Sequence, residues 1–399
     1  MSYRPLAGVT LIEASSFIAS PSAGLYLAQL GARVIRVDQI GGGPDFRRWP
    51  LAQNGSSLYW ENLNRGKESI ALDLSGAEGR DLLVRLVRAS GILLTNYPVD
   101  GFLSHDRLRG GRDDLITLRV MGRADGGSAL DYTVNAAVGY PLQTGEGPGP
   151  VNHVLPAWDL LTGAYAAFAL LAALRHRDAT GEGGEVRVPL EDVAIGSAAN
   201  IGSIAEVLLR GADRPRYGNS VYGAFGRDFL TADGERIMLM AMTPRQWSAL
   251  IDVLDLREAV AAIETERGVN FARDEGVRFE HRDALYPLVE AAVARRQCDE
   301  LTRALDAAGG CHGRYQTMLD AARDTRLVGD NPLFAPASNP SGEHYRAASA
   351  FAAKPDAPRQ PPLPAPELGR DSRRVLSDLL KLEPAETDEL IARGVVGDA

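Results

Sequence analysis

The first 120 residues alternate short apolar runs with helical segments, and this alternation constrains the fold more than any other feature. Residues 8–13 and 32–38 have the apolar content of buried strands, and residues 21–30 between them are typical of a helix that Ser20 opens and Gly31 closes. Further strands are expected at 69–74, 91–95 and 115–120, with a helix at 77–89. The pattern predicts an α/β fold, Rossmann-like, with a mostly parallel sheet covered by helices and a ligand site in the loops after the strands.

The sequence pattern changes near Arg214, from alternating strands and helices to loop signals and a hairpin, and this change predicts a second domain. Residues 228–231 and 237–241 flank the turn 232–235 as a hairpin, and amphipathic helices are expected near 245–254, 281–296 and 298–308. A Pro-rich, extended stretch at 352–366 leads to helical segments at 371–382 and 385–393. We therefore expect a large domain built from 1–213 with 330–399, and a smaller α+β domain over 214–329.

Composition narrows the classes of function. The formal charge of −9 over 399 residues, without clusters of Lys and Arg, argues against a nucleic-acid partner. Two cysteines and six scattered histidines show no metal-ligand spacing, so no metal is expected. Neither a membrane span nor a signal peptide is needed to explain the apolar segments, and a reducing cytoplasm is the expected location.

Three common catalytic motifs are absent from the sequence. Residues 15–21, after the first expected strand, do not contain the Gly-x-Gly-x-x-Gly turn of dinucleotide-binding proteins. No phosphate-binding Gly-Lys-Ser loop occurs, and Ser203 lacks the flanking glycines of a serine hydrolase. Polar loops after strands remain, at 41–48, 64–67 and 96–98, together with the turn around Asp159.

Asp159 is the first candidate for a catalytic residue. It stands where a polar loop gives way to the Ala- and Leu-rich run 163–174, which is apolar almost all round and should form a helix inside the protein. Free backbone N–H groups and the helix dipole would hold a carboxylate in that first turn. The alternative is that Asp159 only caps the helix.

Several segments together resemble a known family. They are residues 27–38, residues 64–74, Asp159 before its Ala/Leu helix, and Arg175 followed by 180–183. In this order, over nearly the whole chain, they are similar to the class III (formyl-CoA transferase type) CoA-transferase family. Residues 40–50, 126–135, 151–159 and 222–229 are closest to its mesaconyl-CoA branch, which moves CoA between the two carboxyl groups of one mesaconate.

The resemblance implies a mechanism. Asp159 would attack the thioester carbonyl, and an aspartyl-CoA thioester would form before CoA passes to the second carboxylate. Donors at the helix N-terminus would stabilise the oxyanion. The resemblance further implies an interlocked homodimer, an acyl-CoA substrate, and no permanently bound cofactor, since CoA enters as part of the substrate.

The resemblance also assigns binding residues. Candidates for contact with CoA are Gln39, Asn64, Lys67, Asn96 and Tyr97. Candidates for contact with the acyl group are Ile18, Arg47, Arg48, Tyr132, His153 and Arg227, with the arginines suited to a free carboxylate. In the alternative reading, Lys67 and Asn96 are ordinary turn residues, the arginines lie on the surface or in a dimer interface, and His153 is structural.

Two departures from the family pattern bear on the substrate. Ile18 stands where transferases of free oxalate or formate carry a glutamine, and Leu130 stands where the racemase branch carries a histidine base. The first departure favours a bulkier acyl group than oxalate or formate, and the second argues against racemisation. Two other functions stay open: an intermolecular CoA-transferase that needs a second free acid, and a CoA-ester binding protein without turnover.

Overall fold

The computed structural model describes residues 3–398, and the chain divides into two compact units. Unit 1 comprises 1–139, 152–211 and 325–399, and unit 2 comprises 140–151 and 212–324. The domain boundaries expected from the sequence remain a prediction. The units differ from those domains most clearly at residues 140–151, which group with unit 2.

Unit 1 is built on a seven-stranded sheet in the order β12-β3-β2-β1-β4-β5-β6. The strands are β1 (Thr10–Ala14), β2 (Arg33–Gln39), β3 (Glu68–Leu72), β4 (Ile92–Thr95), β5 (Ile116–Met121), β6 (Gly184–Pro189) and β12 (Val396–Gly397). Every pair is parallel except β12 with β3. The predicted α/β class with a mostly parallel sheet is confirmed, whereas the short antiparallel edge strand β12 was not foreseen.

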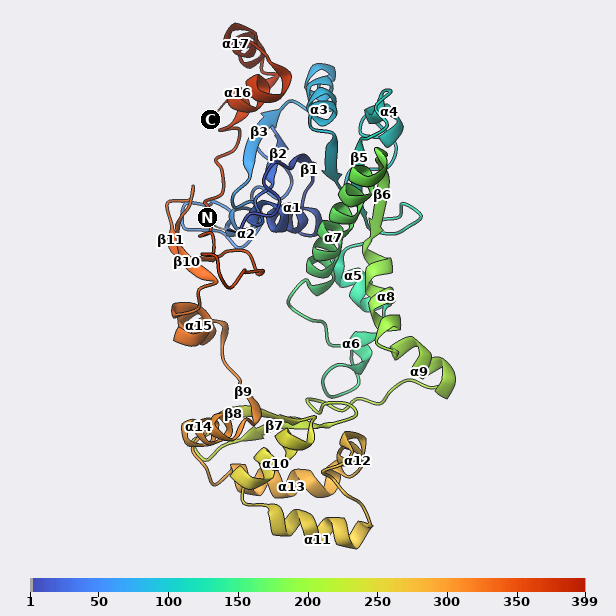
Figure 1. Ribbon diagram of the computed structural model, residues 1–399, viewed down its shortest axis with the longest axis vertical. Coiled ribbons are helices and arrows are strands. Elements are labelled where there is room, and N and C mark those ends of the chain that lie inside the picture. Colours follow the sequence, from blue (N-terminus) through green and yellow to red (C-terminus); the bar gives the residue numbers. More distant parts are fainter. Residues whose placement is uncertain (1–2, 399) are drawn as a thin grey trace. The chain divides into compact units, whose positions relative to one another are not determined.

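Helices cover both faces of this sheet (Figure 1). On one face, α1 (Ala19–Gln29) and α7 (Ala157–Thr180) pack together over side chains such as Leu11 and Leu118. On the other face, α3 (Ala77–Ser90), α16 (Ser372–Val375) and the π-helical turn η2 (Leu376–Leu380) cover side chains such as Ile12. The alternation of Leu11 and Ile12 follows from the two-residue period of a strand.

Helix α7 is less buried than its sequence predicts. The buried face includes Thr162 and Gly163, and a Cβ at Gly163 would lie 2.0 Å from the Ser22 hydroxyl, so α1 and α7 approach closely there. Leu161, Tyr165 and Phe168 on α7 are exposed, so the expectation of a wholly interior helix is wrong for the single chain. By length and composition alone, α7 could span a membrane, and 33% of its most apolar window is buried in the structure. That buried face, however, belongs to the core of unit 1.

The start of α1 also differs from the prediction. The helix begins at Ala19, after Ile18, and no side chain caps it. Ser20 therefore lies inside the helix, where its buried hydroxyl has no hydrogen-bond partner. The rest of unit 1 consists of α2 (Leu58–Leu63), α4 (His105–Arg109), α5 (Asp131–Ala137), α8 (Leu190–Asn200), α9 (Ser203–Arg210), η1 (Thr325–Gly329), the hairpin β10 (Phe334–Ser338) and β11 (His344–Ala348), and α17 (Pro384–Ala392).

Unit 2 is a three-stranded antiparallel sheet with helices packed on it. The strands are β7 (Phe225–Leu230), β8 (Arg236–Ala241) and β9 (Cys311–Arg314), in that order. The helices are α6 (Tyr140–Gln143), α10 (Pro244–Val253), α11 (Arg257–Arg267), α12 (Glu275–Glu280), α13 (Arg282–Val293), α14 (Cys298–Ala308) and α15 (Met318–Arg323). The predicted hairpin and the three predicted helices are confirmed, and α6, α11, α12, α15 and β9 are additions.

Candidate active site

The strand order reverses between β1 and β4, and the candidate site lies at the carboxyl end of this pair. The side chain of Asn96, just after β4, bridges to the loop after β1: its Oδ1 accepts from the N–H of Ser16 at 3.2 Å, and its Nδ2 donates to the Ser16 carbonyl at 2.9 Å. The Thr95 hydroxyl donates to the Ala14 carbonyl at 2.7 Å. These bonds hold two loops together at the position where open α/β sheets bind ligands.

Asp159 occupies the first turn of α7, but the N–H groups of that turn are already used. The N–H groups of Trp158 and Asp159 donate to Asp131 Oδ2 at 2.7 and 3.0 Å. Those of Ala157 and Leu160 donate to backbone carbonyls. The expectation that free amides hold Asp159 and the oxyanion is therefore wrong, and so is the alternative that Asp159 caps its own helix. Asp131 is the cap.

The carboxylate of Asp159 is half-buried and accepts no hydrogen bond from any residue between 3 and 398. Burial raises its pKa to about 7, the negative charge of Asp131 adds to the rise, and Arg48 opposes it. A carboxylate with a raised pKa and no partner is typical of catalytic positions.

Asp131 is held from three sides at the start of α5. Besides the two N–H groups of α7, its Oδ1 lies 2.6 Å from Nε2 of His153, and only 2% of the residue is exposed. The His153 ring contacts the rings of Tyr132 and Trp158, and the Tyr132 hydroxyl donates to the Val154 carbonyl at 3.1 Å. Tyr132 and His153, both predicted from the sequence, therefore lie beside the start of α7.

Arg48 provides the positive charge near Asp159. Its guanidinium lies over the rings of Phe17 and Tyr59, 5.5 Å from each centroid. Burial raises the pKa of Tyr59, the charges of Asp159 and Asp45 add to that rise, and Arg48 lowers it. Within residues 3–398 the buried Tyr59 hydroxyl makes no well-formed hydrogen bond, and Arg48 is the cation that acts on it. We call Asp159, Asp131, His153, Arg48 and Tyr59 the Asp159 cluster.

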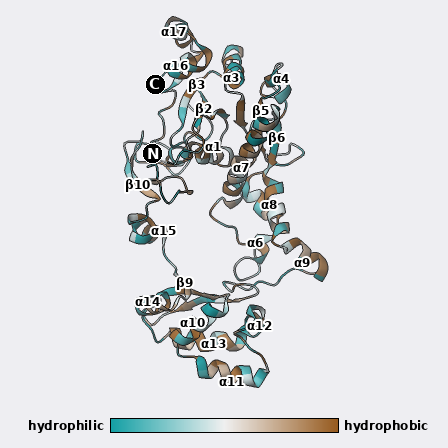
Figure 2. Ribbon diagram, viewed as in Figure 1, coloured by the Kyte–Doolittle hydropathy of each residue, from teal (hydrophilic) through white to brown (hydrophobic). Residues whose placement is uncertain are grey.

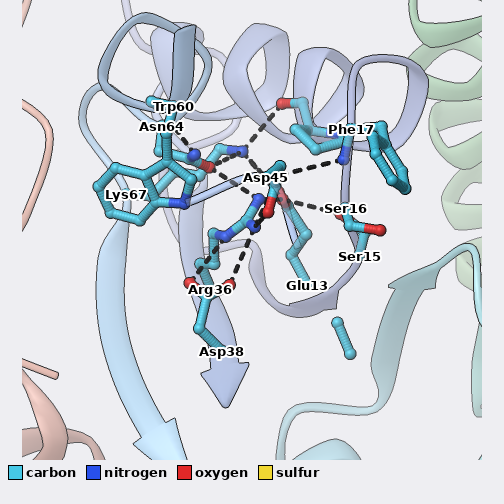
Figure 3. Close-up of polar contacts among 12 residues, drawn as sticks. Glu13, Ser15, Ser16, Phe17, Arg36, Asp38, Asp45, Trp60, Asn64 and Lys67 are labelled. Atoms are coloured by element: carbon cyan, nitrogen blue, oxygen red, sulfur yellow. Dashed lines mark hydrogen bonds and ion pairs between the residues drawn. The ribbon is translucent and has the colours of Figure 1, made fainter. Parts of the chain in front are cut away.

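A second cluster of charges lies under the loops after β1 and β2 (Figure 3). At its centre is Arg36, whose guanidinium pairs with Asp38 at 2.9 Å, Asp45 at 3.2 Å and Glu13 at 3.3 Å. Burial disfavours the charged guanidinium, but Asp38 and Asp45 more than offset this, and the pKa of Arg36 is raised. With Lys67 and Asn64 these residues form what we call the Arg36 network.

The network also fixes backbone. Asp45 accepts the N–H of Phe17 at 3.0 Å, and Phe17 has a left-handed φ of 69° that is uncommon for a non-glycine residue. A Cβ at Gly24 would lie 1.8 Å from Glu13 Oε2, so only glycine lets α1 approach this buried acid. The network therefore holds the loop after β1 and the loop after β2 against each other.

Lys67 and Asn64, both predicted to contact CoA, are interior members of the network. The Lys67 ammonium binds Glu13 at 2.8 Å, Asn64 at 2.9 Å and the Pro21 carbonyl at 2.8 Å. Burial lowers the pKa of Lys67 to about 8, Glu13 opposes this and Arg36 adds to it. Asn64 is 0% exposed. Both side chains are satisfied by protein groups, and Lys67 is not the solvated turn residue of the alternative reading.

The remaining predicted residues divide between the two units. Gln39 lies at the end of β2, where it donates to Asp73 at 3.3 Å and accepts from the Leu74 N–H at 2.9 Å. Tyr97 is partly buried against Phe102, Ile18 is buried at the start of α1, and Arg47 is exposed. Arg227 belongs to unit 2, where it lies over the rings of Phe229 and Tyr286 and lines a cavity of about 820 Å³.

Sequence reasoning missed the residues that organise the site: Asp131, Tyr59, Arg36, Glu13 and Asp45. One signal was available, because a charged residue in the middle of an apolar strand must be paired if it is buried. Glu13 and Arg36 interrupt strands that are otherwise apolar, and they stand directly opposite each other in the parallel register of β1 and β2. No group of three or more His, Cys, Asp or Glu side chains within residues 3–398 could hold a metal ion.

A family model and known proteins match this chain over nearly its whole length. The family model described as CoA-transferase family III matches residues 6–372. The 2-methylfumaryl-CoA isomerase of Chloroflexus aurantiacus is 43% identical, over 98% of this chain and 97% of that protein. The succinyl-CoA–D-citramalate CoA-transferase of the same organism is 27% identical, over 98% of each.

Solved structures share the fold. A CaiB/BaiF family protein from Brucella suis superimposes with a TM-score of 0.75 at 24% identity, covering 94% of this chain and 99% of that one. A hypothetical protein from Mycobacterium tuberculosis gives a TM-score of 0.74, also at 24% identity, over 94% and 99%.

Proposed function

The chain belongs to CoA-transferase family III, and from this premise we propose that it isomerises mesaconyl-CoA by intramolecular CoA transfer. The reaction converts 2-methylfumaryl-CoA into 3-methylfumaryl-CoA by moving CoA from one carboxyl group of mesaconate to the other. The name of the relative that is 43% identical over nearly the full length of both chains supports this substrate.

One observation carries the chemistry: the Asp159 carboxylate is half-buried at the start of α7 and accepts no hydrogen bond within residues 3–398. A paired carboxylate is a poor nucleophile, because its lone pairs are already occupied and its negative charge is stabilised. With its pKa raised to about 7, Asp159 is more basic than an ordinary aspartate.

The proposed reaction consists of four displacement steps. An oxygen of Asp159 attacks the thioester carbonyl, and CoA thiolate leaves, which gives a mixed anhydride between Asp159 and the acid. The thiolate then attacks the Asp159 carboxyl carbon, and mesaconate leaves as a dicarboxylate. Its other carboxylate attacks the aspartyl-CoA thioester, thiolate leaves again, and the thiolate attacks the acyl carbon of the new anhydride, which regenerates Asp159.

Among the predicted arginines, Arg48 is the one we propose for the negative charge of the acyl group. It acts electrostatically on Asp159, whereas Arg47 is not among the charges that shift the pKa of Asp159 and Arg227 belongs to unit 2. For CoA we propose the edge formed by the ends of β2 and β4, where Gln39, Asn96 and Tyr97 lie. Lys67 and Asn64 would support this edge from beneath.

We also propose that the working enzyme is a homodimer. Exposed apolar side chains lie on two helices that come after Asp159 in the chain: Tyr165 and Phe168 on α7, and Leu208 and Leu209 on α9. Both helices carry stretches of hydrophobic residues, drawn brown in Figure 2. A second copy would remove them from water. Cytoplasmic location remains a prediction.

The test is to trap the intermediate. We expect hydroxylamine, added with mesaconyl-CoA, to convert Asp159 to a hydroxamate, and borohydride to reduce the aspartyl-CoA thioester to an alcohol, both visible by peptide mass spectrometry. Asp159→Asn serves as the matched control. Both regioisomers should equilibrate without incorporation of labelled free mesaconate.

The alternative functions give different results. Incorporation of the label would favour an intermolecular transferase, a function named for the relative that is 27% identical. Unchanged binding of mesaconyl-CoA with no turnover in either the wild type or Asp159→Asn would indicate a binding protein. Turnover without any adduct at Asp159 would refute the proposed nucleophile.

A further inference from the structure

Asp131 is a buried acid to which the proposed mechanism gives no role. Its carboxylate accepts from two N–H groups of α7 and lies 2.6 Å from His153 Nε2. It joins three segments: the start of α5, the loop that carries His153, and the first turn of α7.

This capping has a direct consequence for Asp159. Asp159 is the third residue of α7, a position whose side chain can reach back to the backbone N–H of the N-cap residue, but the N-cap is Pro156, which has no N–H. Here Asp131 already accepts the N–H groups of Trp158 and of Asp159 itself. The Asp159 carboxylate therefore has no donor on its own helix and remains available to a ligand.

We propose that Asp131, held by His153, is a positioning residue that keeps the Asp159 carboxylate turned away from its own helix and unpaired for attack on the thioester. This inference rests on the proposed function of Asp159. Neither Asp131 nor His153 needs to touch the reacting atoms. Their effect is to fix the first turn of α7 and to place one negative charge beside the nucleophile.

The charges around Asp159 make the proposal measurable. Asp131 from α5 disfavours ionisation of Asp159, Arg48 from the loop after β2 favours it, and Tyr59 from α2 is the other titratable group coupled to it. If the charge of Asp131 did not act on Asp159, replacing it by a neutral side chain that keeps the acceptor oxygen would leave the titration of Asp159 unchanged. A positioning residue with the proposed role would shift that titration.

The experiment uses Asp131→Asn in the full chain. The pH midpoint of carbodiimide labelling at Asp159 is followed by peptide mass spectrometry without substrate, and kcat and KM are measured across the same pH range. We expect the labelling midpoint to move to lower pH, because the amide keeps an acceptor for the α7 N–H groups but carries no charge. We also expect kcat to fall on the order of tenfold or more, with a smaller change in KM.

His153→Phe provides a second test of the inference if Asp131→Asn does not fold. His153→Phe keeps the ring beside Tyr132 and Trp158 but removes the donor to Asp131, so the charge of Asp131 acts more strongly on Asp159. We expect its labelling midpoint to move to higher pH, opposite in sign to Asp131→Asn. Asp81→Asn, an exposed acid on α3, is the matched control and should leave the midpoint in place.

The outcomes separate this inference from the proposed function. An unmoved labelling midpoint in a folded Asp131→Asn protein, or in His153→Phe if only that variant folds, overturns the inference even when Asp159→Asn is inactive. If Asp159→Asn retains wild-type activity, the proposed function fails, and labelling still reports whether Asp131 controls the titration of Asp159. Midpoint shifts of opposite sign in the two variants support the inference.

Discussion

The Arg36 network and the Asp159 cluster lie in the same unit and contain the same kinds of side chain, yet they treat charge differently. In the network, Arg36 is paired with three carboxylates and Lys67 with Glu13. In the cluster, the Asp159 carboxylate accepts no hydrogen bond from residues 3–398, and the buried Tyr59 hydroxyl makes no well-formed one there. Charges that are paired within the protein hold the loops of the site in place, whereas charges without a partner are available to a substrate.

Removing the nucleophile should give the largest effect on activity and little loss of stability. We expect Asp159→Asn to lower kcat on the order of 10⁴-fold or more, because no other group can form the acyl-enzyme bond. The free energy of unfolding should not fall, because no protein hydrogen bond to the carboxylate is lost. Steady-state kinetics measures kcat, and urea unfolding measures the free energy of unfolding. A strongly destabilised variant would show that Asp159, like the residues of the Arg36 network, stabilises the fold.

Breaking the Arg36 network should do the opposite. Arg36→Met leaves Glu13, Asp38 and Asp45 buried without their shared cation, and we expect a loss of about 3–5 kcal/mol in the free energy of unfolding. The control is Arg33→Met in the same strand, where the pairs with Glu68 and Asp378 are partly exposed and are worth about 1 kcal/mol or less. Equal losses in the two variants, measured by urea unfolding, would mean that burial of the network adds nothing.

Lys67 tests the boundary between the two clusters. Because its ammonium is buried among protein acceptors, Lys67→Met should destabilise the protein by about 3 kcal/mol and leave KM for the CoA ester largely unchanged in the molecules that remain folded. The reverse pattern, with a raised KM and unchanged unfolding, would show that Lys67 contacts CoA as the family resemblance implies.

Arg48 and its neighbour Arg47 form a matched pair for the acyl site. Arg48→Gln removes the positive charge that lowers the pKa of Asp159, so the pH midpoint of kcat/KM should move to higher pH, and kcat/KM at pH 7 should fall on the order of 10²-fold. Arg47→Gln should have the smaller effect, since Arg47 is not among the charges that shift the pKa of Asp159. A larger effect of Arg47→Gln, in the same pH-rate measurement, would reverse the assignment.

The sequence predicts the parts of the molecule that periodic patterns determine. The β-α-β alternation predicted the parallel sheet, and the turn at 232–235 predicted the hairpin of β7 and β8. Asp159 was placed at a helix start from the change in composition alone. The cap at Asp131 was not predictable in this way, because residues 131 and 159 are joined only by the folding of α5 against α7. Similarly, Leu161 and Phe168 gave no sign that one face of α7 is exposed in the single chain.

The smallest expected effect concerns stability and follows from the titration of Asp159. The pKa is 3.8 for the unfolded chain and about 7 in the folded protein, so between these values the folded state binds more protons. The free energy of unfolding therefore falls as pH rises through this window. Asp159→Asn lacks the group, and we expect it to match the wild type below pH 4 and to exceed it by about 1 kcal/mol above pH 7, after allowing for solvent screening.

Urea unfolding of the wild type, Asp159→Asn and Asp81→Asn between pH 4 and pH 8 measures this difference. Asp81 is exposed on α3 and lies outside the Asp159 cluster, so its variant should follow the wild type throughout. A constant difference between Asp159→Asn and the wild type would mean that Asp159 titrates as an ordinary aspartate. In that case the Arg36 network and Asp159 would still differ in their hydrogen bonds, but not in the ionisation of their carboxylates. The raised basicity of Asp159 would then have to arise only when substrate binds.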